Sequence, residues 1–119
     1  MLTEFGRVLR KIRIDHAEII KDMAEKLGVT ASYVSTVETG KRNIPENWVE
    51  QISGMYNLDD DNRQQLKNAA EISAKCIKLN LDNLALGRRE TAILFAREFE
   101  KIDEDTVLKI KSLLRKEEE

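Results

Sequence analysis

Apolar residues recur every three or four positions through the first half of the chain, a spacing that places them on one face of a helix. The pattern predicts helices over about residues 2–14, 19–27, 30–39 and 45–56. Gly28 suits the end of the second helix, because glycine tolerates the left-handed backbone that follows a helix C-terminus. Thr30 can cap the third helix, and Pro45 fits the first turn of the fourth. The first half is therefore expected to be helical.

The apolar spacing changes in the second half of the chain. Asp59, Asp60 and Asp61 favour the N-terminus of a fifth helix, which continues to about residue 73. Residues 76–81 alternate between apolar and polar side chains, and this two-residue period predicts a short β-strand. Helical spacing then returns over about residues 91–102 and 103–114. One short strand cannot form a stable sheet alone, so its symmetry mate in a homodimer is the expected partner.

The composition agrees with a mainly helical protein, because 35% of the 119 residues are charged, 5% are aromatic and only one is proline. We expect an N-terminal domain of residues 1–57 and a helical C-terminal region of residues 58–119 that holds two copies together. The candidate dimerisation residues are apolar side chains of the predicted strand and of the helix after it: Ile77, Leu79, Leu81, Phe95 and Phe99.

The sequence also excludes several classes of chemistry. A chain of this length leaves little room to enclose a substrate, and it carries no nucleophile–base pair or phosphate-cradling glycine loop, so an enzyme is not expected. The single cysteine, Cys76, and the single histidine, His16, are too few for a zinc site. No metal or cofactor is expected. No apolar run has the length of a signal sequence or a membrane span, which predicts a cytoplasmic protein without membrane contact.

The charge balance argues mildly against a nucleic-acid partner, since the formal net charge is -2. Residues 1–57 hold eight Lys/Arg and eight Asp/Glu, and residues 58–119 hold twelve and fourteen. Positive residues nevertheless cluster locally, namely Arg7, Arg10, Lys11 and Arg13 in the first expected helix and Lys41 and Arg42 after the third. A local positive face is therefore compatible with the sequence.

Residues 23–42, MAEKLGVTASYVSTVETGKR, contain what two short, steeply crossing helices need. Ala24 is a small contact residue, Gly28 supplies the turn, and Val34 and Val37 are apolar anchors. Together with FGRVLRKIR before it and Ile-Pro after it, this stretch resembles the phage-repressor and Cro-like regulators of the Xre family over about residues 5–56. The resemblance implies a five-helix, lambda-repressor-like helix-turn-helix domain that binds double-stranded DNA.

The resemblance also implies roles for individual residues. It makes the third helix the recognition helix, whose N-terminal part meets base edges in the major groove. The candidate base-reading residues are Ala31, Ser32, Ser35 and Thr36. The candidate phosphate-binding residues are Arg10, Lys21, Tyr33, Lys41, Arg42 and Asn43. The structural residues of the motif are Arg13, Ala24, Gly28, Val34, Val37 and Glu38, with Arg13 and Glu38 as a buried pair between the first and third helices.

Two positions depart from the family pattern. Members usually begin the second helix with Thr or Ser followed by Gln, which meets a phosphate, whereas this chain has Ile19 and Ile20. The resemblance therefore does not supply this DNA contact, and the two isoleucines are candidates for a partner surface. The turn before them, residues 15–18, also lacks the usual glycine and apolar residue.

The resulting hypothesis is a sequence-specific transcription regulator, a phage-like repressor that binds a palindromic operator as a homodimer. Two linked modules facing successive major grooves, roughly 34 Å apart, multiply affinity and select a palindrome. The main alternative is an antitoxin that regulates its own gene through the same module while its second half neutralises a toxin. A helical interaction protein without DNA binding is the third hypothesis. The foldable, amphipathic character of residues 88–116 favours the regulator.

Overall fold

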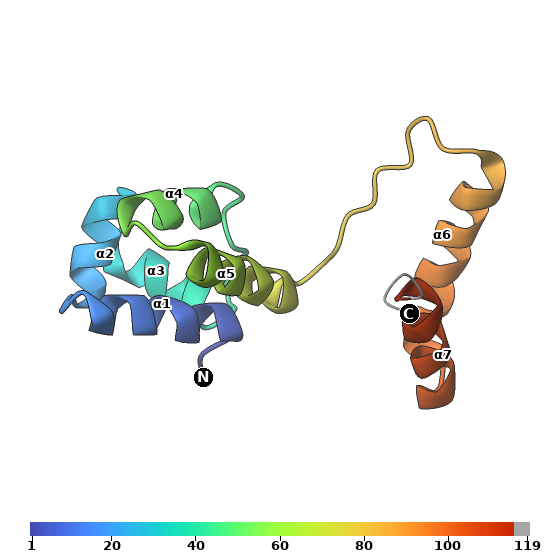
Figure 1. Cartoon of the computed structure of the whole chain (residues 1–119), viewed down its shortest axis with the longest axis horizontal. Helices are drawn as coiled ribbons and strands as arrows, with labels where there is room; N and C mark the ends of the chain where they lie inside the picture. Colours follow the sequence, from blue (N-terminus) through green and yellow to red (C-terminus); the bar gives the residue numbers. More distant parts are fainter. Residues whose placement is uncertain (116–119) are drawn as a thin grey trace. The chain divides into compact units, whose positions relative to one another are not determined.

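The computed structural model describes residues 1–115, and these residues form seven α-helices and one 3-10 helix. The elements are α1 (Glu4–Asp15), α2 (Ile20–Leu27), α3 (Ala31–Glu38), α4 (Trp48–Met55), α5 (Asp60–Ser73), α6 (Leu86–Glu98), η1 (Phe99–Lys101) and α7 (Glu104–Leu114) (Figure 1). The prediction of a mainly helical protein is confirmed. The chain divides into two compact units, the first covering Met1–Ile77 and the second beginning at Lys78.

The first unit is built around α1, which packs against α5 on one side and α3 on another, while α2 packs against both α3 and α4 (Figure 1). These helices share one apolar core. Its buried members are Phe5, Leu9, Ile12, Met23, Ala24, Leu27, Val34, Val37, Trp48, Ile52, Tyr56 and Leu66. Every one of the first five helices contributes to this core, so they form a single cooperative packing unit.

Side-chain caps set where several helices begin. Thr3 accepts a hydrogen bond from the backbone N of Gly6 at 3.1 Å, and Thr30 accepts one from Tyr33 N at 3.0 Å. Asp59 and Asp103 do the same for α5 and α7, each accepting from a backbone amide at 2.8 Å. Such a cap satisfies an amide that has no partner inside the helix, and it stabilises the helix by about 1 kcal/mol.

Helix α5 belongs with the first unit, although the sequence placed a domain boundary at residue 57. Leu66 is fully buried in the core and Ala69 is buried beside it. The backbone N of Phe5 also donates to Ser73 Oγ at 3.0 Å, which ties the end of α5 to the start of α1. The first unit therefore continues past residue 57, because apolar positions of α5 cover one face of α1.

The β-strand predicted for residues 76–81 is not found within residues 1–115. The segment between α5 and α6 has neither helix nor strand, and Ile77 and Leu79 are exposed in it. The chain turns within this segment, where Asp82 N donates to Asn80 Oδ1 at 2.9 Å and Asn83 has φ +64°. A strand requires a neighbouring strand for its backbone hydrogen bonds, and the described part of one chain provides none.

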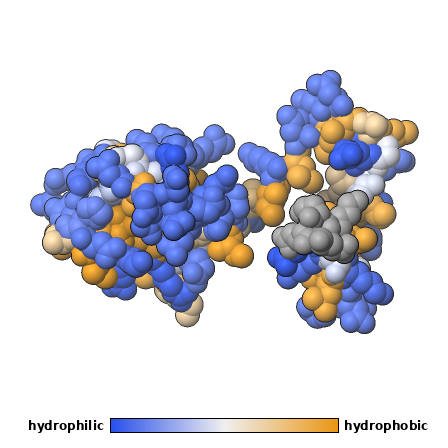
Figure 2. Space-filling view, in the orientation of Figure 1, coloured by the Kyte–Doolittle hydropathy of each residue, from blue (hydrophilic) through white to orange (hydrophobic). Residues whose placement is uncertain are grey.

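The second unit contains α6, η1 and α7, and none of the residues of these elements is buried. Its aromatic rings, those of Phe95 and Phe99, pack against each other with centroids 5.3 Å apart. Hydrophobic side chains reach the surface of this unit in several places (Figure 2). Among residues 1–115, no helix combines the length and apolar character that crossing a membrane requires.

Candidate nucleic-acid interface

The turn between α2 and α3 depends on the backbone conformation of Gly28. Its φ is +73°, in the left-handed region, and its N donates to Glu25 O at 3.2 Å. The N of Val29 then donates to Ala24 O at 3.0 Å, which closes the end of α2. A Cβ on Gly28 would meet no atom within 4 Å. Glycine is thus required here for its positive φ rather than for space.

Helices α2 and α3 meet through small and apolar side chains. Met23, Ala24 and Leu27 of α2 are buried together with Val34 and Val37 of α3 in the shared core. Ala24 places only a methyl group between the two helices, so their backbones can approach closely. This packing fixes one face of α3 against the domain.

The opposite face of α3 carries the candidate base-reading residues. Ser32 and Ser35 are exposed, and Ala31 and Thr36 are partly exposed. The hydroxyl of Thr36 donates to Tyr33 O at 2.7 Å, so its proton is already used within the helix. Its methyl group and its remaining acceptor capacity stay available for contacts outside the domain.

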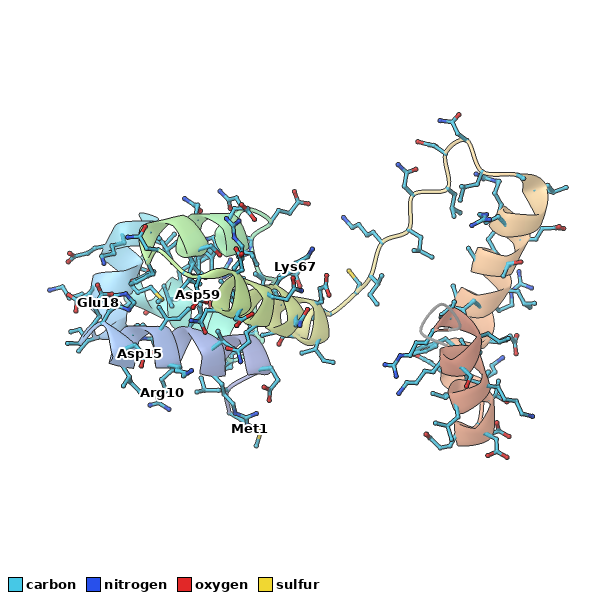
Figure 3. The ribbon with its side chains drawn as sticks, in the orientation of Figure 1. Met1, Arg10, Asp15, Glu18, Asp59 and Lys67 are labelled. Atoms are coloured by element: carbon cyan, nitrogen blue, oxygen red, sulfur yellow. The ribbon has the colours of Figure 1, made fainter. Side chains whose placement is uncertain are left out.

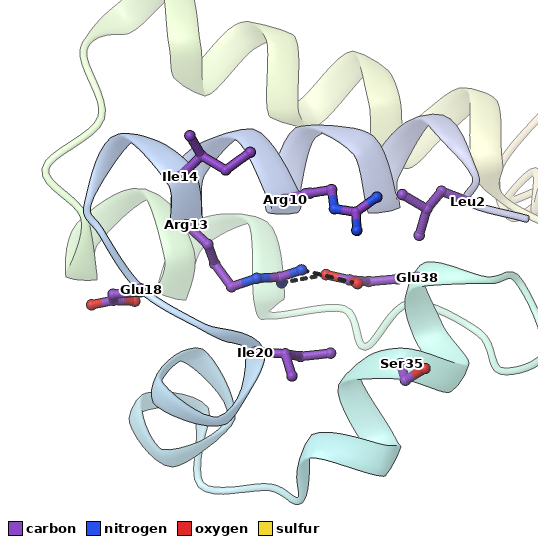
Figure 4. A pocket seen from close by; sticks show the side chains of 8 residues that line it. All are labelled: Leu2, Arg10, Arg13, Ile14, Glu18, Ile20, Ser35 and Glu38. Carbon is purple, nitrogen blue, oxygen red and sulfur yellow. Dashed lines mark hydrogen bonds and ion pairs between the residues drawn. The ribbon is translucent and has the colours of Figure 1, made fainter.

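A buried ion pair joins the end of α3 to α1. Arg13 Nη1 donates to Glu38 Oε2 at 2.5 Å and Nη2 to Oε1 at 3.3 Å, with side chains only 9% and 4% exposed (Figure 4). Arg13 Nη1 also lies 3.4 Å from Met23 Sδ of α2. Arg13 therefore contacts both helices of the crossing pair. Because each charge is neutralised by the other, the pair orients α3 relative to α1.

The exposed residues expected to contact phosphates come from three segments. Lys41, Arg42 and Asn43 are exposed in the loop after α3, where the backbone N of Lys41 and of Arg42 donate to Thr36 O at 2.9 and 3.1 Å. Lys21 is exposed on α2. Arg10 projects from α1 (Figure 3) and lines a hollow between α1, α2 and α3 together with Ile20 and Ser35 (Figure 4).

Tyr33 lies at the edge of the core. The centroid of its ring lies 5.9 Å from the centroid of the Trp48 ring. The guanidinium carbon of Arg42 lies 4.6 Å from the centroid of the Tyr33 ring. The ring thus packs between the start of α4 and an exposed arginine.

A family model for a helix-turn-helix domain matches residues 4–66, which is more than half of the chain. The chain belongs to the helix-turn-helix family, in its Xre/Cro-like type. The matched range runs from the first residue of α1 into α5. No curated protein and no solved structure matched the chain. Helix-turn-helix domains of this kind are DNA-binding modules of regulators and are typically not enzymes.

Gly6 is a structural residue of the helix-turn-helix domain that the sequence did not reveal. A Cβ at this position would lie 2.4 Å from the carbonyl oxygen of Glu38, so α1 and α3 touch backbone to backbone here. Thr3 reinforces the contact, because its N and Oγ1 both donate to the same oxygen at 2.9 Å. The signal in the sequence is a glycine inside a helix of good helix formers, where it is destabilising unless space demands it.

The turn before α2 is braced by a polar cluster that the sequence also did not reveal. Glu18 accepts from Lys26 Nζ at 2.5 Å and from Tyr56 Oη at 2.6 Å, and Lys26 Nζ lies 4.5 Å from the Tyr56 ring centroid. These hydrogen bonds, first that from Lys26 and then that from Tyr56, lower the pKa of Glu18. Burial, followed by the bond to Glu18, raises the pKa of Tyr56. Within the turn itself, Ala17 adopts a φ of +53° and Glu18 N donates to Arg13 O at 2.8 Å.

The candidate dimerisation residues lie outside the range of the helix-turn-helix match, and Ile77 is the last residue of the first unit. Ile77, Leu79, Phe95 and Phe99 are exposed, and Leu81 is partly buried. The structure therefore separates the residues considered for DNA contact from those considered for self-association. Each set belongs to a different unit of the chain except for Ile77, which ends the first.

Proposed function

We propose that the protein is a sequence-specific transcription regulator, a repressor that binds a palindromic DNA operator as a homodimer. One observation carries the proposal: Ser32 and Ser35 point outward from a helix whose other side is locked by Val34, Val37 and the Arg13–Glu38 pair. A rigid helix with small polar side chains on its free face fits the major groove.

In this proposal the outer face of α3 reads the operator. Ser32 and Ser35 donate to or accept from base edges, while Ala31 and the Thr36 methyl group meet thymine methyls. Lys41 and Asn43 after α3, and Arg10, Lys21 and the hydroxyl of Tyr33 beside it, position the phosphate backbone. Because residues 1–57 carry equal numbers of positive and negative side chains, binding to unrelated DNA is weak.

Self-association through the second unit is supported by the pattern of α6. Residues 92–96 of α6 are five consecutive apolar residues, and at 100° per residue they cover the whole circumference of the helix. Leu94 and Phe95 are nevertheless 57% and 42% exposed. A helical stretch that is apolar on all sides is normally buried, and in this proposal a second copy covers residues 92–96. Residues 86–115 hold seven Lys/Arg and six Asp/Glu, so charge does not oppose pairing.

Selection from a random pool of double-stranded DNA tests the proposal. We expect a palindrome whose half-site centres lie about one helical turn apart. Gel-shift measurements that find no salt-sensitive binding to any pool would contradict DNA binding and favour a protein-interaction role.

Two variants separate base reading from phosphate contact. Thr36→Ala is expected to relax the base preference at one operator position. The free energy of binding to the best site should weaken by about 1 to 3 kcal/mol. Lys41→Ala is expected to weaken binding to all DNA sequences alike. It should also reduce the slope of log affinity against log salt concentration by about one unit. Lys67→Ala, which removes the same charge from α5 (Figure 3), is the control. If Lys41→Ala and Lys67→Ala change the affinity and its salt dependence equally, Lys41 does not contact DNA.

The second candidate function, an antitoxin, is supported by the same exposed surface of α6, because a toxin can cover it as well as a second copy can. Light scattering on the purified chain distinguishes the two. We expect a homodimer, and Leu94→Glu should convert it to a monomer. Stoichiometric co-purification of a different protein chain would favour the antitoxin over the homodimeric regulator.

A further inference from the structure

The side chain of Arg42 runs back along α3 from the loop that follows this helix. Its guanidinium carbon lies 4.6 Å from the centroid of the Tyr33 ring, and Nε donates to Thr36 Oγ1 at 3.4 Å. Its backbone N donates to Thr36 O at 3.1 Å. An exposed arginine is thus held at three points beside the outward face of α3.

This arrangement restricts the orientation of the guanidinium as well as its position. The guanidinium carbon lies over the Tyr33 ring, and the bond to Thr36 uses the single Nε proton. Within residues 1–115, the two terminal nitrogens make no hydrogen bond to the protein. Tyr33 is itself packed against Trp48, so the aromatic support is connected to the core. The free edge of the guanidinium carries the two terminal nitrogens. Because the Arg42 side chain is already held in place, it loses less conformational entropy on binding than a mobile arginine does.

The location of this edge favours bases over phosphates. Tyr33 lies in the first turn of α3, and the N-terminal part of a recognition helix is the part closest to base edges. A phosphate contact requires charge within reach and tolerates a mobile side chain. A planar, pre-oriented fork matches a pair of acceptors, which can be two phosphate oxygens or guanine O6 and N7, and its place beside the first turn of α3 favours the guanine.

We propose that Arg42 is a specificity-determining residue that reads one guanine in each operator half-site, with Tyr33 and Thr36 as its positioning residues. The inference rests on the proposed function, since it requires α3 to enter the major groove. It replaces the phosphate role that the sequence suggested for Arg42. It also assigns a second task to Thr36, which accepts from Arg42 while presenting its methyl group to the neighbouring base.

Binding measurements on the selected operator test the inference, with all four bases placed at each half-site position in turn. We expect one guanine whose replacement weakens binding by the wild-type protein about 10- to 100-fold. Arg42→Lys keeps the charge but loses the fork, so it should abolish this preference while the salt slope persists. Lys41→Ala is the neighbouring control, and it should weaken all operators alike with the guanine preference intact.

The positioning role of Tyr33 has its own readout. Tyr33→Leu removes the aromatic support without altering Arg42, and we expect a smaller guanine preference at the same position, with thermal unfolding as a check on folding. If Arg42→Lys retains every base preference of the wild-type protein, Arg42 is a phosphate contact and the inference is wrong. If the wild-type protein binds no DNA, the proposed function itself fails together with the inference.

Discussion

Two glycines of the first unit have different physical reasons to be glycine, and a third has neither of these reasons. Gly28 adopts a positive φ with open space around it, whereas Gly6 is needed because the Glu38 carbonyl occupies the place of a side chain. Gly54, inside α4, has neither constraint, because a Cβ there would meet nothing within 4 Å and its φ is ordinary. The structure therefore predicts opposite effects for the same substitution.

Gly6→Ala is expected to destabilise the protein by about 1–3 kcal/mol, since α1 must move away from α3 to admit the methyl group. Gly54→Ala is the matched change in an exposed helix and should stabilise by about 0.5–1 kcal/mol. Urea unfolding of the full chain measures both free energies. A neutral Gly6→Ala variant would show that the approach of α1 and α3 is looser than the structure indicates.

The Arg13–Glu38 pair is the other residue-scale feature with a measurable consequence. Arg13→Ala leaves the Glu38 carboxylate buried without its partner, and a loss of about 3–5 kcal/mol in the free energy of unfolding is expected. Replacing both residues, Arg13→Met with Glu38→Leu, should recover most of this loss because no charge remains buried.

The pair Arg7–Glu4 provides an exposed comparison for this experiment. Its side chains are 58% and 57% exposed, so Arg7→Ala should cost less than about 1 kcal/mol. Thermal unfolding of these three variants and of the wild-type protein gives the comparison. Equal losses for Arg13→Ala and Arg7→Ala would contradict burial as the cause.

At the scale of elements, the cluster of Glu18, Lys26 and Tyr56 links the turn before α2 to the end of α4. Its pH dependence follows from the lowered pKa of Glu18 in the folded protein. A lowered pKa means that folding favours the ionised carboxylate. The stability from this carboxylate is therefore present above the ordinary pKa of 4.5 and is lost as the pH falls through the folded value.

Glu18→Gln is expected to flatten the decline of stability on the acid side of pH 4.5, because the neutral side chain has no proton to take up. Chemical denaturation at a series of pH values from about 6 to 3 measures the slope, a range set by the ordinary carboxyl pKa. Glu25→Gln, on the exposed side of α2, is the matched control. If both variants show the same slope as the wild-type protein, the cluster does not contribute to acid sensitivity.

The helices were predictable from the sequence because their signals are local. Apolar spacing and the N-terminal signals at Thr30 and Asp59 act over a few residues, and the structure places a helix after each of them. The strand at residues 76–81 could not be decided in this way. Two-residue alternation indicates only which side chains share a face, whereas a strand exists when another segment accepts its hydrogen bonds.

At the scale of the whole molecule, the chain consists of a unit with a buried core and a unit without buried residues in α6, η1 and α7. Marginal stability rests largely on buried apolar surface, so the first unit has its own source of stability. The helices of the second unit require cover for their apolar sides. This asymmetry supports the proposal that the first unit contacts DNA and that the second unit links two copies.

A fragment of residues 1–77 tests this division of labour. It is expected to remain folded and monomeric and to keep the base preferences of the full chain. Its affinity for the palindrome should fall about 10²- to 10⁴-fold, because the two half-sites are no longer bound by linked modules. Circular dichroism, light scattering and titration with the operator provide the three readouts. An unchanged affinity would show that residues 78–119 do not connect the half-sites.

The sequence by itself determined the helices of the first unit, the turn at Gly28 and the family of the domain. These features are encoded by short-range spacing, by capping side chains and by a backbone conformation that glycine adopts easily. The resemblance also pointed to Arg13 and Glu38, whose pairing depends on a shared family geometry rather than on their spacing.

Only the tertiary structure decided which distant residues meet. The burial of Leu66 against α1, the contact of Gly6 with the Glu38 carbonyl and the position of Arg42 over Tyr33 all result from how helices pack. Periodicity identifies the apolar face of a helix but not the segment that covers it. Packing selects that segment through complementary shape across long sequence separations, which a local pattern does not record.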